Sequence, residues 1–177
     1  VTLGTKVFRD GIDITPDDIY VHHKKTGELP KTTAANVGEC EDFFRELTAD
    51  GSSVIHFTIS SSMSSTYNNA CIAASNFDNV FVIDSKNLST GAGLLVIAAA
   101  EMANSGMEAE KIVDEIEKLV PCVDASFVID SLEYLHQGGR CSAVAMLGAN
   151  LLKLKPCIEV KNGKMGVEKK YRGKYID

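Results

Sequence analysis

The sequence predicts an α/β fold, with a mainly parallel sheet flanked by helices and the start of a second, smaller α+β domain. Three short apolar runs rich in β-branched residues occupy residues 54–59, 80–83 and 127–129. Continuous apolar runs of this length are typical of strands that are covered on both faces. Helical patterns separate the runs, and strands that alternate with helices indicate βαβ units and a parallel sheet.

The helices are predicted from apolar side chains at helical spacing and from residues that begin helices. Residues 1–8 form a strand pattern, and the first helix follows around Phe43, where Asn36 and Glu39 have the spacing of a capping box. A second helix around Tyr67 begins after a serine-rich segment, and serine is a favourable N-cap residue. Two more helices follow the second strand, with apolar positions at Leu94, Leu95, Ala98 and Met102 and at Ile112, Val113, Ile116, Leu119 and Val120.

The C-terminal part of the chain has a different pattern. Asn162-Gly163 lies between two alternating segments, which is a strong β-hairpin signal. We therefore expect an α/β ligand-binding domain over residues 1–152, incomplete at its N-terminus, and a hairpin over residues 153–177 that begins a truncated second domain. Because the first strand has no preceding element and the last residues have no closing one, we expect the chain to be a fragment of a longer protein.

The charge of the chain is unevenly distributed. The net charge of −6 gives no general attraction to nucleic acid. Residues 1–152 contain 10 Lys and Arg against 21 Asp and Glu, whereas residues 153–177 contain 8 against 3. Five widely spaced cysteines predict neither disulfides nor a zinc site, and the longest apolar stretch, residues 91–100, is about half of the ~20 residues in a spanning helix. We expect a cytoplasmic protein without stable membrane insertion.

Six hydroxyl side chains crowd residues 60–66, between the first apolar strand and the next helix. In open parallel sheets, ligands bind in the crevice at the carboxyl ends of the strands. Unpaired N–H groups at helix N-termini favour carboxylates and phosphates there. The alternative is that these serines only cap the helix and form a turn, although capping needs one or two of them and not six. The segment therefore predicts a binding site for a small acidic ligand.

Three other segments are weaker candidates for the same crevice. Hydroxyls in residues 30–36 precede a helix, where threonine is also an ordinary cap. Gly138-Gly139-Arg140 combines backbone freedom with a side chain that pairs bidentately with carboxylates or phosphates, and the alternative is a helix C-cap followed by a solvent-facing arginine. The turn at residues 84–86 ends the second strand near the crevice, where it has either a supporting role or the role of an ordinary Asx turn.

The chain lacks the usual parts of an enzyme active site. The nucleophile elbow G-x-S-x-G and the phosphate loop G-x-x-x-x-G-K-[ST] are absent from the sequence. His22, His23, His56 and His136 are the candidate bases. His56 lies within an apolar strand and is expected in the core or on the sheet face, whereas His22 and His23 precede two lysines and are expected in solvent. We expect no catalytic residue, no metal and no cofactor.

Several of these segments together resemble one family. The shared segments are residues 30–33, 60–68, 132–142 and 151–156, followed by the Asn-Gly hairpin and Arg172-Gly173. On these segments, which cover nearly the whole chain, the sequence is similar to the DegV family of bacterial fatty-acid-binding proteins. It departs from the family pattern at Ala35-Asn36 and Ser65, where small size is kept. It also has no counterpart of the family's opening Asp-Ser strand or of its C-terminal half, which includes a histidine that helps to hold the carboxylate.

The resemblance implies a two-domain protein that buries one long-chain fatty acid. Such a protein presents the carboxylate to a separate fatty acid kinase, which forms an acyl phosphate for phospholipid synthesis. By position, Ser61 and Thr33 would bind the carboxylate, with Thr32 and Ser62 close by. Arg140 matches the family's Gly-Gly-Arg motif, which lies near the opening where the kinase would work. The resemblance therefore implies a lipid-binding carrier protein and not an enzyme.

Two other functions remain open on the residues alone. One is a small-molecule hydrolase or transferase that uses Ser61 as its nucleophile. The other is a regulatory protein that binds a different acidic metabolite, which a polar inner pocket would favour. A carrier agrees with the physics, because burial of an acyl chain supplies ~0.8 kcal/mol per CH₂ and the polar loops then only orient the carboxylate. The basic residues 153–177 form either a docking surface for an acidic partner or a solvated pair of strands.

Overall fold

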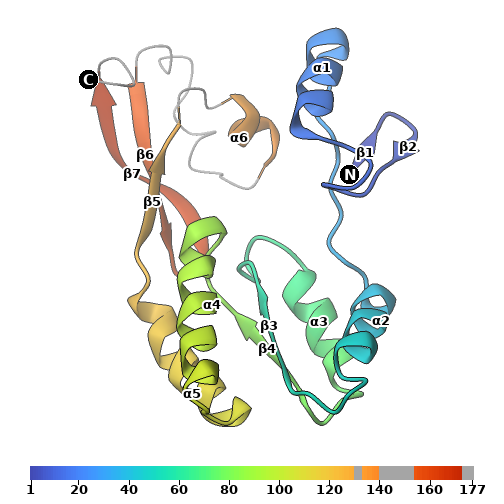
Figure 1. Cartoon of the computed structure of the whole chain (residues 1–177). Coiled ribbons are helices and arrows are strands. Elements are labelled where there is room, and N and C mark those ends of the chain that lie inside the picture. Colours follow the sequence, from blue (N-terminus) through green and yellow to red (C-terminus); the bar gives the residue numbers. More distant parts are fainter. Residues whose placement is uncertain (130–132, 140–153, 173–177) are drawn as a thin grey trace.

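The computed structural model describes residues 1–129, 133–139 and 154–172. Figure 1 shows three groups of elements: an N-terminal hairpin with a helix, a central α/β unit, and a C-terminal antiparallel sheet. The central unit contains strands between two layers of helices, which confirms the predicted α/β fold class. None of the helices in these ranges is long and apolar enough to cross a membrane.

The central unit is a βαβ arrangement. Strand β3 (Val54–Thr58) pairs in parallel with β4 (Val80–Asp84), in register from Val54 opposite Val80 to Thr58 opposite Asp84. Helix α3 (Thr66–Ala74) connects the two strands. Because parallel strands need a crossover connection, the apolar runs and the helical pattern between them predicted this unit correctly.

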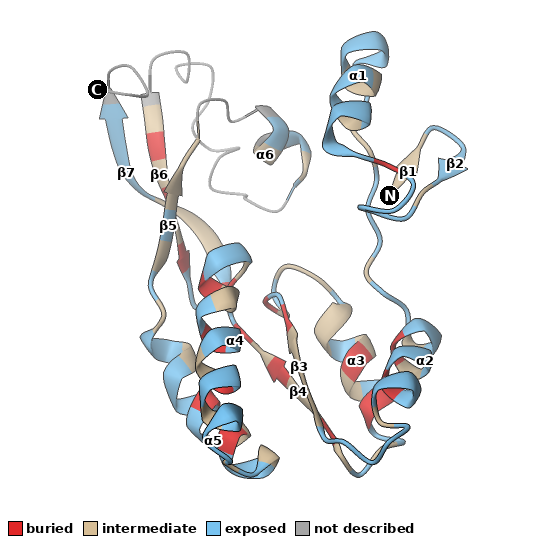
Figure 2. Cartoon of the chain, viewed as in Figure 1, coloured by how far each residue is buried: buried red, intermediate tan, exposed pale blue. Residues whose placement is uncertain are grey.

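Helices cover both faces of the β3–β4 pair. Helix α2 (Val37–Leu47) and α3 lie on one side, and α4 (Ser89–Asn104) and α5 (Ala109–Leu119) lie on the other (Figure 1). Alternate residues of each strand point to opposite faces and so enter two separate cores. The buried residues of the first core are Cys40, Phe44, Ala70, Ala73, Ala74 and Val80, and those of the second are Ile83, Leu95, Ala99, Ile112 and Ile116. Figure 2 shows buried segments on each of the four helices.

The predicted capping box begins helix α2. The Asn36 side chain accepts a hydrogen bond from the Glu39 N–H (3.0 Å), and the Glu39 carboxylate accepts one from the Asn36 N–H (2.8 Å). Both bonds satisfy N–H groups that have no partner within the helix. The helix therefore begins where the sequence predicts it.

Asn36→Ala is expected to lower the free energy of unfolding by about 1 kcal/mol, because the N-terminal N–H groups of α2 lose a side-chain acceptor. Urea unfolding followed by circular dichroism measures this change. Glu46→Ala is the matched control, since Glu46 is an exposed residue of the same helix away from its start, and an effect within about 0.5 kcal/mol is expected. Equal effects of the two substitutions would contradict a capping role.

The N-terminal region differs from the sequence prediction. Residues 1–8 form a hairpin of β1 (Thr2–Leu3) and β2 (Lys6–Val7), in place of the single strand that was expected. Gly4 has φ 57° and makes the turn possible. Helix α1 (Pro16–Thr26), which the apolar pattern did not predict, follows with a capping box at its start. None of its residues is fully buried, so it has no strong apolar stripe to detect.

The C-terminal hairpin is confirmed, and its partner strand is a correction. Strands β6 (Leu154–Lys161) and β7 (Lys164–Arg172) are joined by the predicted Asn-Gly turn. The third apolar run forms β5 (Ala125–Val128), which follows the 3₁₀ turn η1 (Val120–Cys122) and pairs antiparallel with β6. Its expected place in the parallel sheet is therefore wrong, because an apolar run predicts a strand but not its neighbour. Since β5 and β6 lie on either side of the expected boundary after residue 152, the division into two domains stays a prediction.

Candidate functional site

A cavity of about 700 Å³ lies at the carboxyl ends of β3 and β4. Its walls come from the loop before α2, the serine-rich loop between β3 and α3, the residue before α4, and strand β7. The lining residues are Thr32, Thr33, Ala34, Ala35, Ile59, Met63, Ser64, Ser65, Thr66, Leu88 and Met165. The lining combines hydroxyls with apolar side chains, and the cavity volume is within the ~300–1,000 Å³ range of small-molecule pockets. The arrangement suits an amphipathic ligand.

The loop that carries Thr32 and Thr33 is held at both ends. Before the two threonines, the Lys31 N–H donates to the Thr2 carbonyl (3.0 Å) and the Lys31 carbonyl accepts from the Thr2 N–H (2.7 Å). After them, the Asn69 amide of α3 donates to the Ala35 carbonyl (2.7 Å). These contacts bring both threonines to the same cavity as the serine-rich loop, although the two segments are far apart in the sequence.

The six hydroxyls of the serine-rich loop have different positions. Ser64, Ser65 and Thr66 line the cavity. The Ser64 hydroxyl also accepts a hydrogen bond from the Thr66 N–H (3.2 Å), so one serine does serve the start of α3. Ser60 is fully buried, and Ser61 and Ser62 are not among the residues that line the cavity. Capping therefore explains one of the hydroxyls and leaves the others for a different role.

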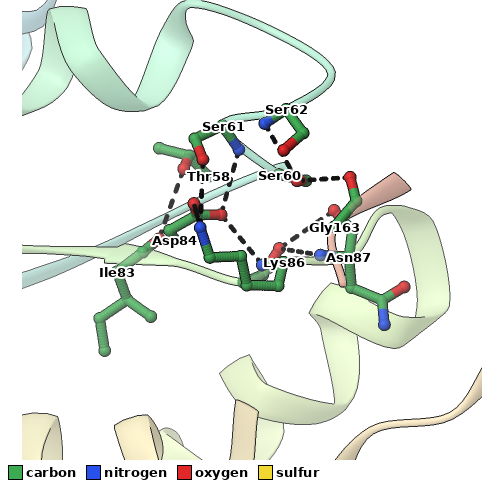
Figure 3. Close-up of polar contacts among 10 residues, drawn as sticks. Thr58, Ser60, Ser61, Ser62, Ile83, Asp84, Lys86, Asn87 and Gly163 are labelled. Carbon is green, nitrogen blue, oxygen red and sulfur yellow. Dashed lines mark hydrogen bonds and ion pairs between the residues drawn. The ribbon is translucent and has the colours of Figure 1, made fainter. Parts of the chain in front are cut away.

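Ser61 belongs to a polar cluster with Asp84 and Lys86 (Figure 3). The Ser61 N–H donates to Asp84 Oδ1 (3.1 Å), and Lys86 Nζ donates to the Ser61 hydroxyl (3.2 Å). Lys86 Nζ also lies 2.7 Å from Asp84 Oδ2. The turn at residues 84–86 thus supports the serine loop. The Lys86 N–H also donates to Asp84 Oδ1 (3.0 Å), which is the Asx-turn contact that the sequence offered as the alternative.

Asp84 is the buried charge of this cluster. Its side chain is only 8% exposed, whereas that of Lys86 is 49% exposed. Burial would raise the pKa of Asp84, but hydrogen bonds from Lys86 and Ser61 outweigh burial and hold the pKa below its ordinary value. The carboxylate is therefore ionised at neutral pH and is balanced by one lysine.

The tip of the β6–β7 hairpin packs against the serine loop. The Ser60 hydroxyl donates to the Gly163 carbonyl (2.7 Å) and accepts from the Ser62 N–H (3.2 Å) (Figure 3). A Cβ atom on Gly163 would lie 2.5 Å from Ser60 Oγ and 3.4 Å from Lys86 Cδ. The hairpin, which also contributes Met165 to the cavity, therefore sets the position of the loop that carries the candidate residues.

The remaining candidates lie elsewhere. Arg140 and the side chain of His136 lie outside the described residues. Helix α6 (Glu133–Gln137), which contains His136, is followed by a glycine pair in which Gly139 has φ 68°. His56 is on the sheet face as expected, with its ring 5.2 Å from that of Phe44, and burial lowers its pKa. His23 was expected in solvent, but its ring packs edge-on against that of Tyr134, with 5.2 Å between the ring centroids.

Sequence reasoning missed several lining residues. Leu88 and Met165 carry no polar signal, and Met165 comes from a hairpin that is distant in the sequence. Ser64, Ser65 and Thr66 were seen as part of the hydroxyl-rich segment but were not singled out as ligand-binding residues. The order of polar residues in the loop contains no information about which side chains turn toward the cavity.

Comparisons with known sequences give a consistent result. A family model described as "Uncharacterised protein, DegV family" matches residues 1–175. Curated relatives include a DegV domain-containing protein of Caldanaerobacter subterraneus, which is 34% identical over 175 residues; these are 98% of this chain and 62% of that protein.

Solved structures with the same fold are also found. A DegV family protein from Thermus thermophilus, described for its fatty acid binding, has a TM-score of 0.87 and 29% identity, over 97% of this chain and 61% of that one. A stearic acid-binding protein from Eubacterium ventriosum has a TM-score of 0.82 and 33% identity, over 94% and 59% of the two chains. The chain thus spans about three-fifths of the length of these relatives.

Proposed function

The chain belongs to the DegV family, and from this premise we propose that it binds a long-chain fatty acid. The observation that carries the proposal is the lining of the cavity, which combines hydroxyls of two loops with the apolar side chains of Ile59, Met63, Leu88 and Met165. The fatty-acid-binding relatives from Thermus thermophilus and Eubacterium ventriosum support it. Each buried CH₂ of an acyl chain contributes about 0.8 kcal/mol, so affinity comes mainly from the tail.

The carboxylate is proposed to bind between the two hydroxyl-bearing loops. Thr33 and Ser61 are its proposed hydrogen-bond donors, with Thr32 and Ser62 beside them and Arg140 near the opening. Thr33 faces the cavity, and Ser61 lies in the same loop as Ser64, which also lines it. Hydroxyl groups satisfy a buried carboxylate by hydrogen bonds, so the head group does not need a dedicated arginine or metal ion.

A carrier that holds its ligand without chemistry needs a partner that acts on the head group. We propose that the partner is the catalytic subunit of a fatty acid kinase, which phosphorylates the presented carboxylate. Exposed lysines of the β6–β7 hairpin, such as Lys161, Lys164 and Lys169, form the proposed docking surface for an acidic face of that subunit. The hairpin suits this role because its tip packs directly against the serine loop.

The geometry around Ser61 argues against the alternative of a nucleophilic serine. Among the described residues, Lys86 is the titratable side chain that donates to the Ser61 hydroxyl. A lysine activates a serine only as the neutral amine, whereas Lys86 is held as a cation in an ion pair with Asp84. The cluster is therefore suited to bind and not to deprotonate.

Thr33→Ala and Ser61→Ala are each expected to weaken fatty acid binding by about tenfold, because each removes one hydrogen bond to a charged head group. Native mass spectrometry of the chain purified from a bacterial host detects co-purified fatty acid. The bound lipid is then extracted, and binding of added palmitic acid to the delipidated chain measures the change. Ser53→Ala is the control, since Ser53 is exposed at the opposite end of β3, and unchanged binding is expected. A fatty acid retained equally in all three variants would contradict the proposed head-group site, and an esterase activity lost only in Ser61→Ala would favour a hydrolase.

A further inference from the structure

We propose that Lys86 is a positioning and specificity residue for the ligand carboxylate. By neutralising Asp84, Lys86 allows a carboxylate to bind at the neighbouring Ser61 hydroxyl. The inference rests on the proposed function, because it concerns the head group of a bound fatty acid. It assigns the Asp84–Lys86 pair to acid recognition, separately from the hydroxyls that contact the ligand.

The first step concerns the charge that an acidic ligand meets. Asp84 is almost fully buried and accepts the Ser61 N–H at 3.1 Å. Ser61 Oγ and Asp84 Oδ2 lie 3.2 and 2.7 Å from the same Lys86 Nζ, so a ligand carboxylate bonded to the Ser61 hydroxyl comes near a second carboxylate, and nearby like charges disfavour each other. An uncompensated Asp84 would therefore repel the head group or force its protonation.

The second step concerns the position of the compensating cation. Lys86 Nζ lies 2.7 Å from Asp84 Oδ2 and donates to the Ser61 hydroxyl at 3.2 Å, so the ammonium lies between the buried carboxylate and the serine (Figure 3). The Lys86 side chain is 49% exposed, so its ammonium is accessible to solvent. A cation at this point offsets the charge of Asp84, so a second carboxylate at the Ser61 hydroxyl is not repelled.

The third step concerns the backbone that places the lysine. Lys86 has φ 50°, a left-handed conformation that is costly for a residue with a side chain. The Lys86 N–H donates to Asp84 Oδ1 (3.0 Å), so the same carboxylate holds the strained turn and pairs with the ammonium. Backbone strain of this kind is found mainly at functional sites, where surrounding contacts hold the strained conformation in place.

The inference is tested by comparing an acid with a neutral ligand of the same chain length. Palmitic acid and methyl palmitate are titrated into the delipidated chain, and the bound fraction is followed by native mass spectrometry. Lys86→Met is expected to weaken palmitic acid binding by about tenfold and to change methyl palmitate binding by less than about twofold. Lys86→Arg, which keeps the cation, is expected to retain most of the acid binding.

A double variant separates charge compensation from a structural role. Asp84→Asn combined with Lys86→Met removes both charges, and it is expected to bind palmitic acid more tightly than Lys86→Met alone. Equal loss of acid and ester in Lys86→Met, or a double variant no better than the single one, would overturn the inference while leaving the proposed function intact. Failure of the unsubstituted chain to bind either ligand would overturn the proposed function and this inference with it.

Discussion

Phe44→Ala is expected to lower the free energy of unfolding by about 3–5 kcal/mol, the largest effect of any single substitution considered for this protein. Phe44 is fully buried in α2, and its ring lies 5.2 Å from that of His56 and 6.1 Å from that of Phe77. The neighbouring core side chains Ala70 and Ala73 are too small to fill the space that the ring leaves. The free-energy cost of the lost burial therefore adds to the cost of the cavity that remains.

Phe43 provides a matched control for this prediction. It is the adjacent residue in the same helix and is also a phenylalanine, but it is 48% exposed. Phe43→Ala is therefore expected to cost clearly less than Phe44→Ala in urea unfolding followed by circular dichroism. If both substitutions destabilise the chain equally, the assignment of Phe44 to the centre of the α2–α3 core is wrong.

Gly163→Ala is expected to destabilise the chain by about 3 kcal/mol and to weaken fatty acid binding as well. Gly163 has φ 76°, and a left-handed conformation costs alanine roughly 1–2 kcal/mol. The added Cβ would lie 2.5 Å from Ser60 Oγ, so the buried hydrogen bond from Ser60 to the Gly163 carbonyl would be strained or lost, at roughly 1–3 kcal/mol more. Ligand binding is affected because the hairpin tip positions the serine loop.

Gly166→Ala is the control in the same hairpin. No atom lies within 4 Å of a Cβ built on Gly166, and its φ is not positive. We expect it to change the free energy of unfolding by less than about 1 kcal/mol and to leave palmitic acid binding unchanged. If Gly163→Ala leaves both the free energy of unfolding and palmitic acid binding unchanged, the contact between the hairpin and the serine loop does not determine the geometry of the site.

Local signals predicted the elements of the central unit and the C-terminal hairpin, but they missed helix α1 and the β1–β2 hairpin. The apolar runs of β3 and β4, the capping box at Asn36 and the Asn162-Gly163 turn each depend on residues within one segment, so each is visible in the sequence. The error for β5 was of a different kind. Its apolar run predicted a strand, but the packing of Phe127 against the distant Ile158 selected its partner.

The local features of the candidate site were also predictable from the sequence, whereas its long-range contacts were not. The sequence by itself determined that hydroxyls gather in residues 30–36 and 60–66 and that one of these segments follows a parallel strand, because those features follow from composition and local order. Only the tertiary structure decided that Ser64 and Ser65 line the cavity, that Ser61 joins Asp84 and Lys86, and that Gly163 holds the loop. These contacts join segments far apart in the chain, and their geometry is set by packing and by burial of charge, which no local pattern records.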